Sequence, residues 1–161
     1  MIAVIGGGEC DPETARRAEI VGRLVAEAGG VVVCGGLGGV MEAACRGAKQ
    51  AGGLTLGILP GTDRNSANPF VDIALPTGLS EARNCLVVRI AQAVIAIGGE
   101  FGTLSEIGFA LKLGIPVIGL GTWDLGKEGR RIPCLQEALN PEQAVRLALE
   151  SASGLDRNPK D

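Results

Sequence analysis

The chain has no histidine and no tyrosine, and only one tryptophan and three phenylalanines occur among its 161 residues. Histidine is the side chain that most readily transfers protons near neutral pH, and it is the commonest metal ligand in proteins. Its absence excludes Ser-His-Asp triads, other histidine-based acid–base catalysis and histidine metal sites. We therefore expect no protein-bound metal ion.

Closely paired cysteines are also absent. The cysteines show no C-x-x-C spacing and their number is odd, the five being Cys10, Cys34, Cys45, Cys85 and Cys134. Zinc sites and disulfide frameworks use an even or closely spaced set of cysteines. Reduced thiols in a reducing cytosol are therefore the expected state.

Long apolar runs are missing too. No stretch reaches the length of a membrane span, and no charged segment precedes an apolar one at the N-terminus. We expect a cytoplasmic protein without a membrane partner. The formal net charge of −3 argues against a nucleic-acid partner. The length predicts one domain over residues 1–153, with residues 154–161 as a flexible tail.

The chain does contain a regular alternation of short apolar runs and amphipathic segments. Expected strands are residues 2–6, 31–34, 54–59, 71–75, 94–97 and 116–120, and expected helices are residues 12–28, 40–51, 79–91, 104–113 and 141–152. Asp11 is the expected N-cap of the first helix, and residues 122–133 are expected to be irregular. Strands that are apolar on both faces predict an α/β fold, a three-layer Rossmann-like parallel sheet with helices on both faces.

Glycine-rich loops follow three of the expected strands. Each loop leads toward a helix, whose first N–H groups lack partners within the helix and can bind a phosphate. The candidate phosphate-binding residues are Gly7, Gly8, Gly35, Gly36, Gly38, Gly39, Gly98, Gly99, Gly102 and Thr103. The alternative is that these glycines only allow tight turns and close packing of helices on strands.

Neither of the two longer loops is a standard nucleotide-binding motif. No G-x-x-x-x-G-K-[ST] string occurs, so a P-loop is excluded. The first turn lacks the third glycine of G-x-G-x-x-G, and the second strand ends in Cys34-Gly35 rather than in an acidic residue. The sequence therefore disfavours an NAD-dependent reaction.

Arg83 and Glu106 are candidate catalytic residues. Arg83 is expected in the first turn of the third helix, after the N-cap Ser80, where a cation opposes the helix dipole unless an anion lies nearby. A surface ion pair with Glu81 is the alternative. The string T-L-S-E that ends at Glu106 also matches a capping box, in which the carboxylate only caps a helix.

Three segments resemble the LOG (Lonely guy) phosphoribohydrolases, a family long labelled as lysine decarboxylases. The string "GGEFGTLSE" is similar to the family signature P-G-G-x-G-T-x-x-E, and "CGGLGGVMEAACRGA" is similar to its first glycine loop. The string "NPFVDIALPTGLSEARN" looks closer to the bacterial branch that includes molybdenum cofactor carrier proteins. The resemblance implies a Rossmann-like homodimer that binds a nucleotide or pterin phosphate.

The resemblance also implies residue roles. Arg83 and Glu106 match the catalytic positions, and Gly99, Gly102 and Thr103 match phosphate contacts. The chain departs from the signature in three places: Ile97 replaces the proline, Gln92 stands where an aspartate often occurs, and Glu100 adds an acid to the phosphate loop.

Two functions remain open at this point. One is hydrolysis of the N-glycosidic bond of a nucleoside 5′-monophosphate, which requires no cofactor. The other is non-catalytic binding of the molybdenum cofactor, with Glu106 mainly a helix cap. A pyridoxal-phosphate lysine decarboxylase is disfavoured, because Lys49 and Lys112 are expected at carboxyl ends of helices, away from the ligand edge. Leu86, Val87 and Ile90 form either a dimer surface or part of the protein's own core.

Overall fold

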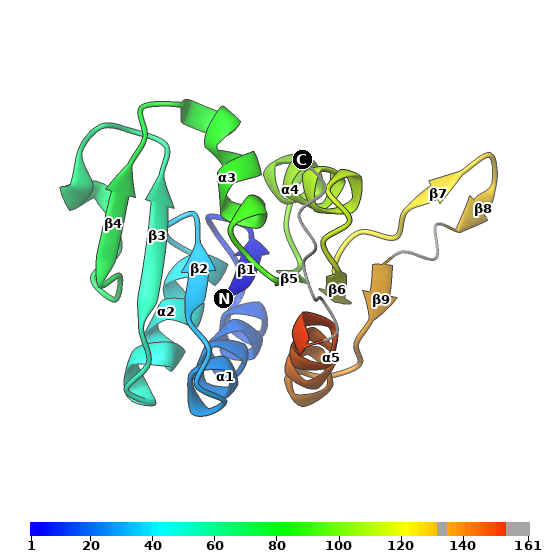
Figure 1. The fold of residues 1–161 in the computed structure, drawn as a ribbon, viewed down its shortest axis with the longest axis horizontal. Helices are drawn as coiled ribbons and strands as arrows, with labels where there is room; N and C mark the ends of the chain where they lie inside the picture. Colours follow the sequence, from blue (N-terminus) through cyan, green and yellow to red (C-terminus); the bar gives the residue numbers. More distant parts are fainter. Residues whose placement is uncertain (132–134, 154–161) are drawn as a thin grey trace.

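The computed structural model describes residues 1–131 and 135–153, and it has the predicted α/β architecture (Figure 1). Seven parallel strands form one sheet in the order β4-β3-β2-β1-β5-β6-β9. The strands are β1 Ile2–Gly6, β2 Val32–Cys34, β3 Thr55–Leu59, β4 Ile73–Pro76, β5 Ala93–Ile97, β6 Val117–Leu120 and β9 Leu135–Glu137. The helices are α1 Pro12–Glu27, α2 Val40–Gln50, α3 Asn84–Arg89, α4 Phe101–Lys112 and α5 Pro141–Ser153.

Helices cover both faces of the sheet. Val4 of β1 belongs to a core cluster that it shares with α1, α2 and α5. Its neighbours Ala3 and Ile5 point to the opposite face and belong to a second cluster, shared with α3 and α4. Since side chains alternate across a strand, a strand that is buried on both faces needs apolar residues at every position. This explains the continuous apolar runs of the sequence.

The strand order fixes the place for a ligand. β2, β3 and β4 follow one another on one side of β1, whereas β5 pairs with the other side of β1. The order therefore reverses between β1 and β5, and ligands of such sheets bind beyond the carboxyl ends of the strands at this point. The glycine loops after β1, β2 and β5 all lie at this edge.

Helices α1 and α2 pack side by side through glycines. A Cβ atom at Gly22 of α1 would collide with the backbone carbonyl of Ala44 in α2, and one at Gly47 of α2 would collide with the carbonyl of Glu19. Asp11 caps α1 as predicted, because its carboxylate accepts a hydrogen bond from the Thr14 N–H at 2.7 Å.

Several expected boundaries are wrong. The segment expected as the third helix begins as a 3₁₀ turn, Ser80–Arg83, and only then becomes α3; Ser80 has φ 48° and is not an N-cap. Helix α4 begins at Phe101, three residues before the expected start. The segment expected to be irregular contains a hairpin, β7 Gly126–Lys127 and β8 Arg130–Arg131, and β9 was not expected at all. The expected tail and Cys134 lie outside the described residues.

The candidate dimer surface packs against the protein's own core. Val87 is fully buried, and Leu86 and Ile90 pack against the same cluster. None of the described helices is long and apolar enough to cross a membrane.

Candidate functional site

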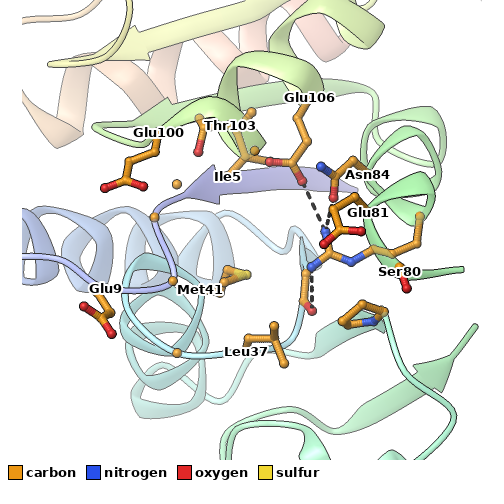
Figure 2. Close-up of a pocket in the computed structure, with 18 residues that line it drawn as sticks. Ile5, Glu9, Leu37, Met41, Ser80, Glu81, Asn84, Glu100, Thr103 and Glu106 are labelled. Atoms are coloured by element: carbon orange, nitrogen blue, oxygen red, sulfur yellow. Dashed lines mark hydrogen bonds and ion pairs between the residues drawn. The ribbon is translucent and has the colours of Figure 1, made fainter. Parts of the chain in front are cut away.

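A cleft of about 550 Å³ lies at the carboxyl ends of β1, β2 and β5 (Figure 2). Loops after all three strands line it, together with the 3₁₀ turn and the first turns of α4. Its lining residues are Ile5, Gly6, Gly7, Gly8, Glu9, Gly35, Leu37, Gly38, Met41, Pro60, Ser80, Glu81, Arg83, Asn84, Glu100, Gly102, Thr103 and Glu106. The volume lies in the usual range for small-molecule sites.

The loops after β1 and β2 are packed against each other. The Val40 N–H donates a hydrogen bond to the Gly7 carbonyl at 3.1 Å, which joins the start of α2 to the first turn. Gly39 has φ 60°, and a Cβ atom there would collide with the backbone of Gly7 and Gly8. Glycine is therefore required at this position, and no side chain caps the start of α2.

The loop after β5 holds the start of α4 at the opposite wall. Gly98 and Gly99 have φ 53° and 94°, and a Cβ atom at Gly99 would collide with the Thr103 side chain. Glu100 is the N-cap residue, yet no side chain caps this helix. Gly102 lies in the first turn, and a Cβ atom there would meet no protein atom within 4 Å.

Two helix starts thus face one cleft without side-chain caps. The Val40 N–H at the start of α2 already donates to the Gly7 carbonyl, but the other N–H groups of the first turns have no partner within the helix. Each helix dipole places partial positive charge at this end, and an anion between the two starts would accept hydrogen bonds from these other groups. The arrangement has the chemistry of a phosphate site.

Arg83 lies beside this anion site. It is buried at 7 % exposure, so the alternative of a surface pair with Glu81 is wrong. Its guanidinium donates from Nη2 to the Gly35 carbonyl at 3.4 Å and from Nη1 to Asn84 Oδ1 at 2.5 Å. Its Nε is buried and has no hydrogen-bond partner among the described residues.

Glu106 faces Arg83 across the cleft wall. Its Oε1 lies 3.6 Å from Arg83 Nη1, and its side chain is buried. Burial raises the pKa of Glu106 to about 7, although the nearby Arg83 charge acts in the opposite direction. The capping-box interpretation is wrong, because Thr103 lies inside the first turn of α4 and Glu106 lies in the next turn.

Most of the predicted site residues meet in this cleft. Gly7, Gly8, Gly35, Gly38, Gly102, Thr103, Arg83 and Glu106 all line it. The remaining predicted residues, Gly36, Gly39, Gly98 and Gly99, shape the loops behind it; all four have positive φ. Among the described residues of the lining there is no lysine, which fits the rejection of a pyridoxal-phosphate enzyme.

Sequence reasoning missed Asn84. This residue is buried, lines the cleft and contacts Arg83. Its only signal in the sequence is its position directly after Arg83, in the string "LSEARN". Glu100 departs from an ideal anion site, because Figure 2 shows it near Thr103, away from Asn84 and Glu106, and it lines the cleft at the start of α4.

Comparison with known proteins agrees with this fold. The molybdenum cofactor binding protein of Rippkaea orientalis is 39 % identical, with 92 % of this chain and 94 % of that chain covered and a TM-score of 0.84. The molybdenum cofactor carrier protein of Chlamydomonas reinhardtii is 29 % identical, with 94 % and 98 % covered and a TM-score of 0.82. An uncharacterized protein of Archaeoglobus fulgidus is 46 % identical over 151 residues, which are 94 % of this chain and 95 % of that protein.

One family model matches the chain, and it is not that of the LOG phosphoribohydrolases that the sequence resembles. It covers residues 1–152, which include both glycine loops, Arg83 and Glu106. The chain belongs to the SLOG cluster4 family.

Proposed function

We propose that this protein binds the molybdenum cofactor and carries it as cargo, holding the phosphate of the pterin between its two glycine loops. The observation that carries the proposal is that two uncapped helix starts and a buried arginine border one cleft. Backbone N–H groups of the loops donate to the phosphate oxygens, and the Arg83 guanidinium supplies positive charge. The likeness to two proteins described as binding or carrying this cofactor supports the choice of ligand.

The cleft offers more than a phosphate site. Besides the glycines it is lined by the apolar Leu37, Met41 and Pro60 and by the polar Ser80 and Glu81. A flat heterocycle needs such a mixture, since apolar side chains contact its faces and polar groups pair with its edge. A phosphorylated pterin therefore fits the chemistry of the lining, as would a nucleotide.

The test is the identity of the ligand and the affinity for it. Protein purified from a molybdenum-replete host is denatured, and the released small molecules are analysed by mass spectrometry. Separately, cofactor released from a purified molybdenum enzyme is titrated into the protein. A pterin phosphate in the first experiment and saturable binding in the second are the expected results. A purine nucleotide in the first, or no binding in the second, would contradict the carrier function.

A second function has one specific observation in its favour, the state of Glu106. A phosphoribohydrolase breaks the bond between C1′ of the ribose and the base nitrogen; water adds to C1′, and the base leaves with a proton. A chain without histidine needs another proton donor. Glu106 has a pKa raised to about 7 by burial and can hold that proton near neutral pH.

Product analysis separates the two functions. Purified protein is incubated with each common nucleoside 5′-monophosphate, and free base and ribose 5-phosphate are measured by chromatography. Release that is lost in Glu106→Gln would establish the hydrolase. No release from any of these nucleotides, together with cofactor binding, would leave the carrier alone. The homodimer that the resemblance implies is checked on the same sample by light scattering.

A further inference from the structure

A continuous set of hydrogen bonds joins the two glycine loops beneath the cleft. Arg83 Nη2 donates to the Gly35 carbonyl at 3.4 Å, and Arg83 Nη1 donates to Asn84 Oδ1 at 2.5 Å. Asn84 Nδ2 donates to Ser105 Oγ at 2.9 Å, and Ser105 Oγ donates to the Gly102 carbonyl at 2.7 Å. We call this set the amide relay. Its two ends are Gly35 and Gly102, one in each loop.

Arg83 Nη1 is closer to Asn84 than to Glu106. Nη1 lies 2.5 Å from Asn84 Oδ1 but 3.6 Å from Glu106 Oε1, a separation beyond a hydrogen bond (Figure 2). Asn84 takes one of the two N–H groups of Nη1 and sets the position of this nitrogen short of Glu106. Arg83 and Glu106 therefore form an ion pair without a hydrogen bond between them, and we call this pair open.

The orientation of Asn84 is fixed by the same contacts. An amide has one acceptor oxygen and one donor nitrogen at its end. With Ser105 Oγ accepting from Nδ2, the oxygen is left to face Arg83. Ser105 in turn gives its proton to the Gly102 carbonyl, so its oxygen is free to accept. The Gly102 carbonyl thus orients the Ser105 hydroxyl, which orients the Asn84 amide toward Arg83.

We propose that Asn84, oriented by Ser105, is a positioning residue that holds the Arg83 guanidinium out of a closed ion pair with Glu106 and so keeps it available for the phosphate of the ligand. The part that concerns the phosphate rests on the proposed function. The part that concerns the open ion pair rests on the geometry alone.

If Asn84 had only a structural role, its substitution would change stability but not the pKa of Glu106. In that case its side chain would only stabilise the start of α3, but no described side chain caps this helix, and the amide bonds Arg83 and Ser105 instead. Loss of a structural bond would lower stability without changing the ionisation of Glu106. The two roles therefore differ in a measurable property of Glu106.

Other charges near Glu106 must stay constant in the test. Arg83 of the 3₁₀ turn faces it directly, and the Cys34 thiol of β2 lies close enough to interact with it electrostatically. Three further carboxylates line the same cleft, those of Glu9, Glu81 and Glu100. Substitutions at Ser105 and Asn84 remove none of these charges.

The experiment compares Ser105→Ala with Ser105→Thr, which keeps the hydroxyl; Asn84→Ala is a second test of the same relay. The Glu106 carboxyl is titrated by NMR on ¹³C-labelled protein, with Glu106→Gln to assign its signal. We expect the pKa of Glu106 to fall in Ser105→Ala and Asn84→Ala, because Nη1 closes on the carboxylate, and to stay as in the wild type in Ser105→Thr. An unchanged pKa in both relay variants, with the fold intact, overturns the proposal.

Binding of the molybdenum cofactor gives the second readout. We expect about a tenfold weaker affinity in Ser105→Ala, recovery in Ser105→Thr, and no additional loss when Asn84→Ala is combined with Arg83→Gln, because the relay acts only through Arg83. Additive losses, or full affinity in both relay variants, overturn the proposed role. If the wild type binds no cofactor, the proposed function fails, and the NMR titration still decides whether Asn84 holds the ion pair open.

Discussion

A single methyl group at Gly102 tests the phosphate site with little risk to the fold. Gly102 lies in the first turn of α4 at the edge of the cleft, and its φ is not positive. A Cβ atom there meets no protein atom within 4 Å. Gly102→Ala therefore leaves the backbone N–H in place and adds volume only where a ligand would approach.

Gly108 provides a matched control. It lies in the same helix, is also exposed, and also has open space around an added Cβ atom, but it does not line the cleft. An exposed glycine in a helix costs up to about 1 kcal/mol relative to alanine. Both substitutions should therefore keep or slightly raise the free energy of unfolding, and only the methyl at Gly102 should affect the ligand.

The loss of affinity follows from the hydrogen bonds at stake. A hydrogen bond to a charged group contributes about 1.5–3 kcal/mol, and a methyl group that displaces the phosphate from the start of α4 removes at least one. Each 1.4 kcal/mol is a factor of ten in affinity, so Gly102→Ala should bind the cofactor about 10- to 100-fold more weakly. Gly108→Ala should bind as the wild type does.

The only tryptophan of the chain gives a convenient signal for this titration. The Trp123 indole N–H donates to the Glu100 carbonyl at 3.3 Å, and its ring packs against Phe101, so it reports on the start of α4. Cofactor is titrated while its fluorescence is followed, with calorimetry as a check. Wild-type affinity in folded Gly102→Ala, or equal losses in the two variants, would refute a phosphate at this helix start.

Three further outcomes are expected. Folding raises the pKa of Glu106 from 4.5 to about 7, so the folded state binds this proton more tightly than the unfolded state. The free energy of unfolding should therefore fall by about 3 kcal/mol as the pH rises from 4.5 to about 7, and then level off. Urea denaturation should show this fall in the wild type and not in Glu106→Gln. Gly22→Ala should lower the free energy of unfolding by about 1–3 kcal/mol despite the better helix propensity of alanine, because its Cβ atom collides with a backbone carbonyl of α2; an unchanged denaturation midpoint would contradict this. Cys34 and Cys45 are fully buried, so alkylation followed by peptide mass spectrometry should find both slower to react than the partly exposed Cys10, even though the hydrogen bond from Cys45 lowers the pKa of Cys34; equal rates would contradict this.

The sequence predicted a structural feature correctly where the residues that determine it are close together in the chain. Continuous apolar runs identified the buried strands β1, β2, β5 and β6, since a strand buried on both faces has no polar position. Asp11 could be recognised as an N-cap because its partner, the Thr14 N–H, is only three residues away. The site could be placed at one sheet edge for the same reason, since glycines mark the carboxyl ends of parallel strands.

The sequence-based predictions failed where a feature depends on contacts with a segment far away in the chain. The strand β9 contains the polar residues Gln136 and Glu137, so it has no apolar run, and it exists only because β6 offers a free edge to pair with. The sequence predicted a regular helix from residue 79, but residues Ser80–Arg83 form a 3₁₀ turn. This turn lies against the cleft, a contact that the local sequence does not show. The capping-box alternative for Glu106 failed in the same way, because the capping-box string is local and the burial of this carboxylate is not.

The amino-acid sequence by itself determined the layered α/β fold and the glycine loops, because hydrophobic periodicity and backbone freedom are properties of neighbouring residues. The sequence also indicated Arg83 and Glu106 as members of one site. Only the tertiary structure decided that both are buried, that Asn84 contacts Arg83, that the ion pair stands open, and that the Glu106 carboxyl keeps its proton to near pH 7. Desolvation and charge interactions depend on distances in space between β2, α3 and α4, and no spacing along the chain contains that information.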